Sequence, residues 1–326
     1  MNTSKIALVI GANGGIGRET ALALRQRGWQ VRALVRKPAT EGNQDGITWI
    51  KGDAMQAADV LAAAQGAAVI VHAVNPPGYR GWETLVLPML ENTIAAAKAN
   101  HARIVLPGTI YNYGPDAFPL LKEDSPQHPL TRKGEIRVEM ERRLADAARA
   151  GARTLILRCG DFIGPHAGNT WFSQGLFKPG KPAKTLSYPG NYAIAHAWAY
   201  LPDVAATIAR LLEREHELGD FERFHFGGYW IDGHAMLDAV RRVTHNPRVA
   251  AGHFPWAMTA VLAPFMETLR ELRKMRYLWK AAVELDDRKL VAFLGGRPYT
   301  PLDEAVHTTL TAMECISSHA TAELPA

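Results

Sequence analysis

A glycine-rich segment near the start of the chain constrains its fold more than any other feature. The segment is Gly11-Ala12-Asn13-Gly14-Gly15-Ile16-Gly17, between an apolar run at residues 6–10 and a segment of helical periodicity. In a strand, turn and helix unit, Gly11 permits a tight turn, Gly14 lets a pyrophosphate approach the backbone, and Gly17 lets helix and strand pack closely. The start of the helix offers unpaired N–H groups and the positive end of its dipole to an anion. The segment predicts a phosphate site in a nucleotide-binding fold, and a plain glycine-rich turn is the alternative.

Short apolar runs alternate with longer segments of helical periodicity over the first half of the chain. The apolar runs are residues 6–10, 31–35, 47–50, 69–74, 104–106 and 155–157, and the helical segments are residues 16–27, 55–64, 84–100 and 133–150. Continuous apolar runs of this length are typical of strands buried on both faces, as in a parallel sheet covered by helices. Their order predicts an α/β protein with a Rossmann-type, doubly wound parallel sheet.

The pattern changes after Arg158. Glycine and proline become frequent over residues 164–190, and further helices are expected after Asp203 and over residues 233–243 and 256–275. We predict a dinucleotide-binding Rossmann domain over residues 1–160 and a smaller C-terminal substrate-binding lobe over residues 161–326. The boundary is soft, because the chain can cross between the lobes more than once.

The composition limits the partners and the compartment. The formal charge is +5, but the lysines and arginines are scattered among acids, so no nucleic-acid partner is expected. No apolar run is long enough to cross a bilayer, residues 255–266 being interpreted as a packed helix, and residues 1–5 do not resemble a secretory signal. Cys159 and Cys315 lie far apart in sequence, which favours a reducing compartment. The sequence predicts a cytoplasmic protein without a membrane segment or a metal site.

The residues that follow the second apolar run indicate which dinucleotide is bound. Where an NAD site usually holds an acid for the ribose hydroxyls, this chain has Leu34-Val35-Arg36-Lys37. The guanidinium of Arg36 can donate a fork of hydrogen bonds to a 2′-phosphate, and Lys37 adds charge. NADP(H) is therefore preferred over NAD(H). The alternative is that Arg36 is an ordinary solvated residue at the end of a strand.

Two further segments are expected to contact the coenzyme. Asp53 and Ala54 follow the third apolar run, where a carboxylate can accept a hydrogen bond from the adenine amino group. Asp53 can also, or instead, cap the following helix. Ala73, Val74 and Asn75 end the fourth apolar run, where small residues let a coenzyme lie close. Alternatively, Asn75 begins the turn Pro76-Pro77-Gly78.

With these residues in place, nearly the whole chain resembles the extended short-chain dehydrogenase/reductase family, the NAD-dependent epimerase/dehydratase group. The matching segments are Gly11 to Gly17, Gly108-Thr109 with Tyr113-Gly114-Pro115, Arg158-Cys159-Gly160-Asp161-Phe162-Ile163-Gly164-Pro165, Leu201-Pro202-Asp203-Val204-Ala205 and Pro298 to Leu302. The resemblance implies the Rossmann fold with a substrate lobe and a small-molecule or nucleotide-sugar substrate. It also implies a homodimer, which the apolar segment at residues 84–99 permits.

The chain departs from this family at the Tyr-x-x-x-Lys pair, in which the lysine lowers the pKa of the tyrosine and holds the nicotinamide ribose. The family's usual register places Lys133 at the tyrosine position and Arg137 at the lysine position, and a register shifted by two residues gives Thr131 and Glu135. Neither register supplies a tyrosine. The departure resembles atypical members of the family.

Lys133 and Arg137 are four residues apart and share a helix face. Lys133 can hold the coenzyme ribose or serve as a proton donor if burial and its cationic neighbour lower its pKa. The alternative is that both are exposed cations that pair with Glu139 or Glu141.

Other catalytic candidates lie in the loops that should face the nicotinamide. Thr109 can position a substrate carbonyl, and Tyr111 or Tyr113 can replace the missing acid, although a turn or packing role is an alternative for each. Asp161 and His166 follow the sixth strand, where family members contact substrate and nicotinamide. We interpret Asp203 as the cap of the helix that follows it.

The sequence therefore predicts an NADP(H)-dependent oxidoreductase that acts on a carbonyl or hydroxyl of a small molecule or nucleotide sugar. The proton would come from Tyr111, Tyr113, Lys133 or a bound water. Aromatic residues of the second half, such as Trp171 and Phe172, favour an apolar substrate. One alternative is a non-catalytic NADP(H)-binding sensor or regulator, and a second is a sugar-nucleotide epimerase or dehydratase.

Overall fold

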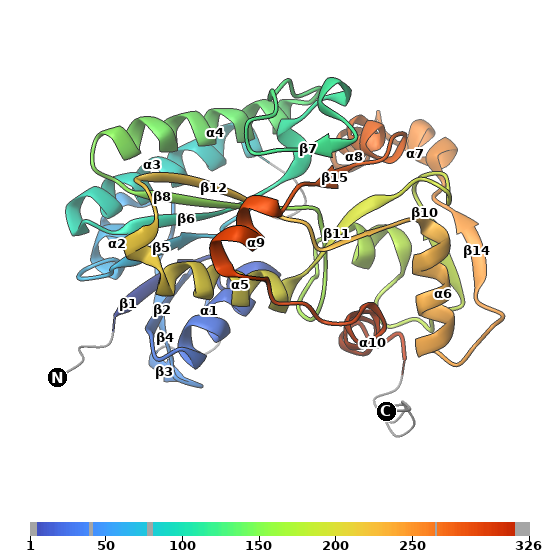
Figure 1. The fold of residues 1–326 in the computed structure, drawn as a ribbon, viewed down its shortest axis with the longest axis horizontal. Coiled ribbons are helices and arrows are strands. Elements are labelled where there is room, and N and C mark those ends of the chain that lie inside the picture. Colours follow the sequence, from blue (N-terminus) through green and yellow to red (C-terminus); the bar gives the residue numbers. More distant parts are fainter. Residues whose placement is uncertain (1–4, 39–41, 77–80, 265, 317–326) are drawn as a thin grey trace.

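The computed structural model describes residues 5–38, 42–76, 81–264 and 266–316. Its centre is an eight-stranded sheet in the order β12-β8-β6-β5-β1-β2-β4-β3 (Figure 1). The strands are β1 (Ile6–Ile10), β2 (Gln30–Val35), β3 (Gly42–Gln44), β4 (Ile47–Lys51), β5 (Val69–His72), β6 (Arg103–Gly108), β8 (Thr154–Cys159) and β12 (Phe221–Phe226). All neighbouring pairs are parallel except β3 with β4. The predicted α/β fold with a doubly wound parallel sheet is confirmed.

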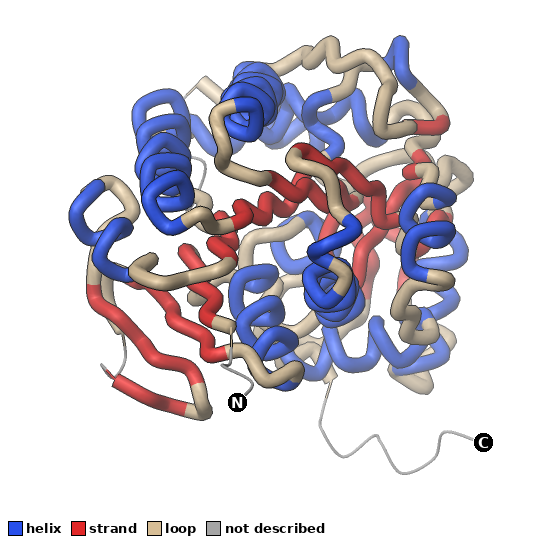
Figure 2. Tube along the Cα trace, turned by 60° about the vertical axis from the view of Figure 1, so that its left-hand side comes forward, coloured by secondary structure: helices blue, strands red, loops and turns tan. Residues whose placement is uncertain are grey.

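Helices cover both faces of this sheet, as Figures 1 and 2 show. On one face lie α2 (Ala57–Ala63), α3 (Trp82–Asn100) and α4 (Arg132–Arg149), whose apolar side chains share one buried cluster with the sheet. On the other face lie α1 (Gly15–Gln26), α5 (Leu201–Glu213) and α9 (Arg288–Leu294), which share a second cluster. Burial on both faces explains why the strands are continuously apolar.

The second half of the chain builds a smaller region beside the sheet and also supplies β12 to the sheet itself (Figure 1). The smaller region contains a three-stranded sheet of β9 (Asp161–Ile163), β11 (His196–Tyr200) and β13 (Tyr229–Ile231), and a pair of β10 (Thr185–Tyr188) with β14 (Ala250–His253). β7 (Leu120–Leu121) pairs with β15 (Glu284–Leu285). The helices of the smaller region are α6 (Gly233–Val243), α7 (Trp256–Leu262), α8 (Glu267–Lys274) and α10 (Leu302–Ala312).

Short helical turns complete the described elements. They are η2 (Ile110–Asn112), η3 (Pro115–Ala117), η5 (Glu215–Glu217) and η6 (Met275–Trp279), with a π-helical turn at η4 (Phe172–Leu176). A third buried cluster joins η4, η6 and β11 and is rich in aromatic side chains, among them Phe172, Trp198 and Trp279. In the part of the chain described, no helix combines the length and apolar character needed to span a membrane.

Two predictions about local structure are wrong. The single helix expected over residues 256–275 is two helices, α7 and α8, and Pro264 lies between them. Proline lacks an amide hydrogen and clashes with the preceding turn, so it ends α7. Asp203 does not cap α5, because Tyr200 is the N-cap residue. Instead, the buried Asp203 carboxylate accepts hydrogen bonds of 2.8 Å from the backbone N–H and the hydroxyl of Thr300.

Candidate functional site

The carboxyl ends of the central strands open onto a cavity of about 520 Å³. This edge of a doubly wound sheet is where such folds bind ligands, because the strand order reverses there. Residues from four strand ends line it, together with the loop after β9. The residues that line it include Gly11, Asn13, Gly14, Gly15, Ile16, Arg36, Asp53, Ala54, Ala73, Val74, Asn75, Asn169 and Thr170.

The glycine-rich turn gives this cavity an anion site made of backbone. Gly14 is the N-cap residue of α1 and no side chain caps the helix, so its first amides are left for a ligand. Gly11 has φ of +92°, and a Cβ there would lie 2.7 Å from the carbonyl carbon of Ala73. A Cβ on Gly17 would lie 2.3 Å from the carbonyl oxygen of Gly11. The turn fits the pyrophosphate of a dinucleotide, because only glycine permits this approach of helix and strands.

The structure brings most of the predicted coenzyme residues together. Arg36 lies at the cavity rim, directly after β2, whereas Lys37 does not line the cavity. Ala12 and Gly17 pack the turn instead of lining the cavity, and Lys133 lies outside the lining. Pro77 and Gly78, part of the alternative turn after Asn75, lie outside the described residues.

Asp53 lines the cavity but does not cap α2. Gln56 is the N-cap residue of α2, so the prediction of a cap at Asp53 is wrong. One oxygen of Asp53 accepts a 3.0 Å hydrogen bond from the amide of Met55, and the Asp53 amide donates to Asp59 over 2.8 Å. These bonds hold the carboxylate at the cavity wall.

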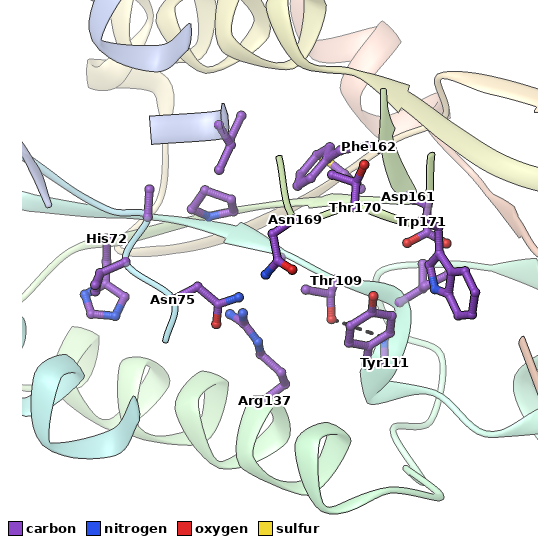
Figure 3. Close-up of a pocket in the computed structure, with 18 of the residues that line it drawn as sticks. His72, Asn75, Thr109, Tyr111, Arg137, Asp161, Phe162, Asn169, Thr170 and Trp171 are labelled. Carbon is purple, nitrogen blue, oxygen red and sulfur yellow. Dashed lines mark hydrogen bonds between the residues drawn. The ribbon is translucent and has the colours of Figure 1, made fainter. Parts of the chain in front are cut away.

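A second, smaller cavity of about 130 Å³ adjoins the first, since Ala73, Asn75, Phe162, Asn169 and Thr170 line both. Figure 3 shows it between α4 and the loops after β6 and β9. The other residues that line it include His72, Trp82, Thr109, Tyr111, Arg137, Asp161 and Trp171. Polar side chains are therefore numerous in its lining.

Of the four predicted catalytic residues, Thr109 and Tyr111 face this second cavity, whereas Tyr113 and Lys133 do not line it. Thr109 is the N-cap residue of η2, and its hydroxyl accepts a 3.2 Å hydrogen bond from the amide of Tyr111 (Figure 3). Both residues line the cavity. Tyr113 is fully buried, with its hydroxyl 3.4 Å from Nε2 of His225, and burial raises its pKa. It lies outside the lining of either cavity.

Lys133 and Arg137 are not the exposed cations that one interpretation expected. Lys133 is buried, and its ammonium lies 5.9 Å from the centre of the Trp82 ring, while the Arg137 guanidinium lies 5.1 Å from the same ring. Arg137 lines the second cavity. Glu139 instead binds Arg142 and Arg143, whose hydrogen bonds lower its pKa to about 2.

A buried ion pair supports the loop that carries Thr109 and Tyr111. Arg158 donates to both oxygens of Glu141, over 2.7 and 2.8 Å, and to the carbonyl oxygen of Thr109 over 2.5 Å. Asn112 and Gln127 each donate to Glu141 over 3.0 Å. Sequence reasoning missed this network, because its members are 14 to 49 residues apart and follow no periodic pattern.

Two histidines near the site differ in their surroundings. His166 is half exposed, has φ of +61°, bonds Glu19 over 2.9 Å, and does not line either cavity. His72 lines the second cavity and bonds the hydroxyl of Thr93 over 2.8 Å. Burial, with a smaller effect of Arg137, lowers the pKa of His72 to about 3, so it is neutral at physiological pH. Among the described residues, no three His, Cys, Asp or Glu side chains are grouped closely enough to hold a metal ion.

Comparison with known proteins agrees with this geometry. A family model described as NAD(P)H-binding matches residues 11–161. The 3-diazoavenalumate denitrifying reductase of a Streptomyces species is 31% identical over 275 residues, which cover 79% of this chain and 85% of that protein.

Solved structures show the same fold. UDP-glucuronic acid 4-epimerase from Bacillus cereus in complex with NAD has a TM-score of 0.73 at 17% identity, over 95% of this chain and 98% of that chain. MoeE5 in complex with UDP-glucose and NAD has a TM-score of 0.70 at 19% identity, over the same shares of the two chains. These structures share the fold, and the reductase relative together with the NAD(P)H-binding family model shows that this chain belongs to a family of NAD(P)H-binding reductases and is an NAD(P)-dependent oxidoreductase-like enzyme.

Proposed function

We propose that the protein is an NADP(H)-dependent reductase of a small, planar and largely apolar molecule that carries a carbonyl or a similarly reducible group. The observation that carries this proposal is the continuity of the two cavities. A dinucleotide seated on the glycine-rich turn extends along the strand ends toward the shared residues Asn75, Phe162 and Thr170. A substrate in the second cavity would meet the nicotinamide there.

The choice of NADP(H) rests on Arg36. It follows β2 directly, lines the coenzyme cavity and is exposed, so its guanidinium can bind a 2′-phosphate through two parallel hydrogen bonds. The cavity lining does contain an acid, Asp53, but this residue follows strand β4 and not β2. No acid therefore takes the position after β2 where NAD sites hold the ribose hydroxyls.

The substrate class rests on the aromatic walls of the second cavity. Trp82, Tyr111, Phe162 and Trp171 line it. The Trp171 ring is fixed by its neighbours, because its centre lies 5.2 Å from that of Trp279 and 5.6 Å from that of Phe254. Rigid aromatic walls favour a flat apolar molecule. The relative named as a reductase of 3-diazoavenalumate supports a reduction as the reaction class.

Bound NADPH would supply a hydride to the substrate. In this arrangement Thr109 and Tyr111 orient the substrate oxygen through their hydroxyls, and the buried Lys133 and Arg137 give the α4 side of the site a positive potential. Tyr113 anchors the same loop, because its carbonyl oxygen accepts a 3.0 Å hydrogen bond from the Tyr277 hydroxyl. The division at residue 160, the homodimer and these residue roles stay predictions.

The test is coenzyme binding followed by turnover. Calorimetry should show saturable uptake of NADPH, at least tenfold tighter than NADH, and absorbance should then fall when aromatic carbonyl or diazo compounds are added. Tight NADPH binding with no consumption across the panel would favour the sensor alternative. Inversion of configuration at a sugar carbon without net NADPH consumption would favour the epimerase alternative. The fold shared with solved epimerase structures is consistent with that alternative. Failure to bind either coenzyme would overturn all three.

A further inference from the structure

A buried carboxylate and imidazole pair lies at the second cavity, on the side opposite α4. Asp161, the first residue of β9, lines this cavity, and Figure 3 shows it at the end where Trp171 lies. Its Oδ2 is 2.7 Å from Nε2 of His196, the first residue of the neighbouring strand β11. The two residues are 35 positions apart in sequence, and only 7% of Asp161 and 1% of His196 is exposed.

The surroundings of His196 fix which nitrogen carries the proton. Its Nδ1 is buried and has no hydrogen-bond partner among the described residues. A proton on Nδ1 would be a buried, unpaired donor, which costs more than an unpaired acceptor. The ring also stacks on Trp279, with centres 4.0 Å apart and planes 15° apart, so it cannot turn without losing that contact. His196 therefore donates from Nε2 to Oδ2 of Asp161.

The second oxygen of Asp161 is the one left for a ligand. Among the hydrogen bonds between described residues, His196 bonds Oδ2 and none joins Oδ1. A carboxyl group in this position has one oxygen fixed by a donor and the other available to the cavity. Oδ1 is therefore the oxygen that can exchange a proton with a molecule bound in the cavity.

We propose that Asp161 is the catalytic acid that replaces the missing tyrosine, and that His196 is its positioning residue. This assignment rests on the proposed reductase function. In the reduction of a carbonyl, the substrate carbon accepts the hydride and the π electron pair moves to the oxygen. That oxygen forms a bond to the proton of Asp161 Oδ1, and the electrons of the broken O–H bond stay on the carboxylate. The substrate is reduced and NADPH is oxidised, and solvent returns the proton to Asp161.

The assignment makes a prediction that packing alone would not. Asp161→Asn keeps the shape of the side chain and an acceptor for His196 but has no acidic proton to give. Its kcat should fall about 100-fold, in line with the usual contribution of a general acid. KM and the NADPH Kd should stay within about threefold of the wild type, because substrate and coenzyme contacts are kept. In Asp161→Ala, added formate should restore part of kcat, since it supplies a carboxyl group to the space left open.

A matched control is Asp203→Asn. Asp203 is a carboxylate with the same 7% exposure, but it binds Thr300 and lies outside both cavities. The variant should lower Tm and leave kcat within about threefold of the wild type. A loss of kcat in Asp203→Asn as large as in Asp161→Asn would overturn the assignment, because it would reflect the loss of any buried carboxylate.

A substrate-free measurement tests the pair independently of the proposed reaction. In the protein labelled with ¹⁵N-histidine, His196 should give the spectrum of a neutral ring protonated on Nε2, and Asp161→Ala should shift that signal. A ring protonated on Nδ1, or kcat of Asp161→Asn within threefold of the wild type, would overturn the proposal. If the proposed function fails instead, the wild type will not bind or consume NADPH, which is a different observation.

Discussion

The two adjoining cavities are built in different ways. The coenzyme cavity is made from backbone and small residues at the ends of neighbouring strands, and its key element is a single turn of seven residues. The second cavity collects side chains from β6, α4, β9 and the loop after β9, which are held by contacts to further residues. A site made of backbone survives most side-chain changes, whereas a site made of side chains can change its chemistry within the same fold. This difference fits the prediction that the chain keeps the coenzyme turn and lacks the Tyr-x-x-x-Lys pair.

The largest expected effect is loss of the ion pair that supports the second cavity. Glu141→Ala leaves the buried Arg158 guanidinium without its carboxylate, which should lower the free energy of unfolding by about 3–5 kcal/mol. Chemical denaturation would measure this. Glu139→Ala is the matched control on the same helix, because its partners Arg142 and Arg143 are partly exposed and a surface pair contributes about 1 kcal/mol or less. Equal losses in the two variants would contradict the role of the buried network.

The next effect tests the backbone-built cavity. Gly17→Ala places a Cβ 2.3 Å from the carbonyl oxygen of Gly11, so helix and turn must separate. NADPH uptake should weaken by about 100-fold, because about 1–3 kcal/mol of overpacking strain falls directly on the anion site. Calorimetry and Tm should be recorded together. Gly28→Ala, which has open space but φ of +80°, should cost about 1 kcal/mol of stability and leave NADPH uptake unchanged. Unaltered binding by Gly17→Ala would disprove the geometry of the turn.

Acid should destabilise the surroundings of the second cavity through two buried histidines. Burial lowers the pKa of His72, which lines the second cavity, and of His225, whose Nε2 lies 3.4 Å from the Tyr113 hydroxyl, to about 3. The unfolded chain takes up these protons below pH 6.5, so stability is complete above that pH and is lost as the pH falls toward 3. At pH 5 each histidine should lower the free energy of unfolding by about 2 kcal/mol relative to neutral pH. His225→Gln should flatten the fall of Tm with pH, whereas His216→Gln, on the surface, should leave it as in the wild type.

Arg36→Ala should change coenzyme choice without changing the reaction. Loss of a charge-assisted pair of hydrogen bonds should weaken NADPH binding by about 10- to 30-fold and leave NADH binding nearly the same. Arg27→Ala removes an equal charge from the end of α1, away from both cavities, and controls for long-range electrostatics. An equal loss for both coenzymes would mean that Arg36 does not bind the 2′-phosphate.

The smallest effect is expected at Tyr111. If its hydroxyl only orients the substrate, Tyr111→Phe should lower kcat/KM by about fivefold, the value of one neutral hydrogen bond. Steady-state kinetics would show this. A fall of 100-fold or more in kcat/KM would make Tyr111, and not Asp161, the proton donor. The chemistry of the second cavity would then depend on the loop after β6 and not on β9.

Local sequence patterns predicted the sheet and the coenzyme turn well, because each depends on neighbouring residues. They failed where distant segments decide the outcome. Asp203 has the position and chemistry of a helix cap but binds Thr300, almost a hundred residues later. Residues 256–275 have helical periodicity, yet Pro264 separates two helices.

The sequence by itself determined the parallel α/β sheet and the anion site at the start of α1, since strand periodicity and glycine spacing are local properties of the chain. Only the tertiary structure decided which side chains meet in the second cavity. Asp161 and His196 carry no shared motif, and the burial of Lys133 and the placement of Arg137 depend on the packing of α4 against Trp82. The physical reason is that burial and charge pairing depend on how separate elements pack, and sequence spacing does not encode that packing directly.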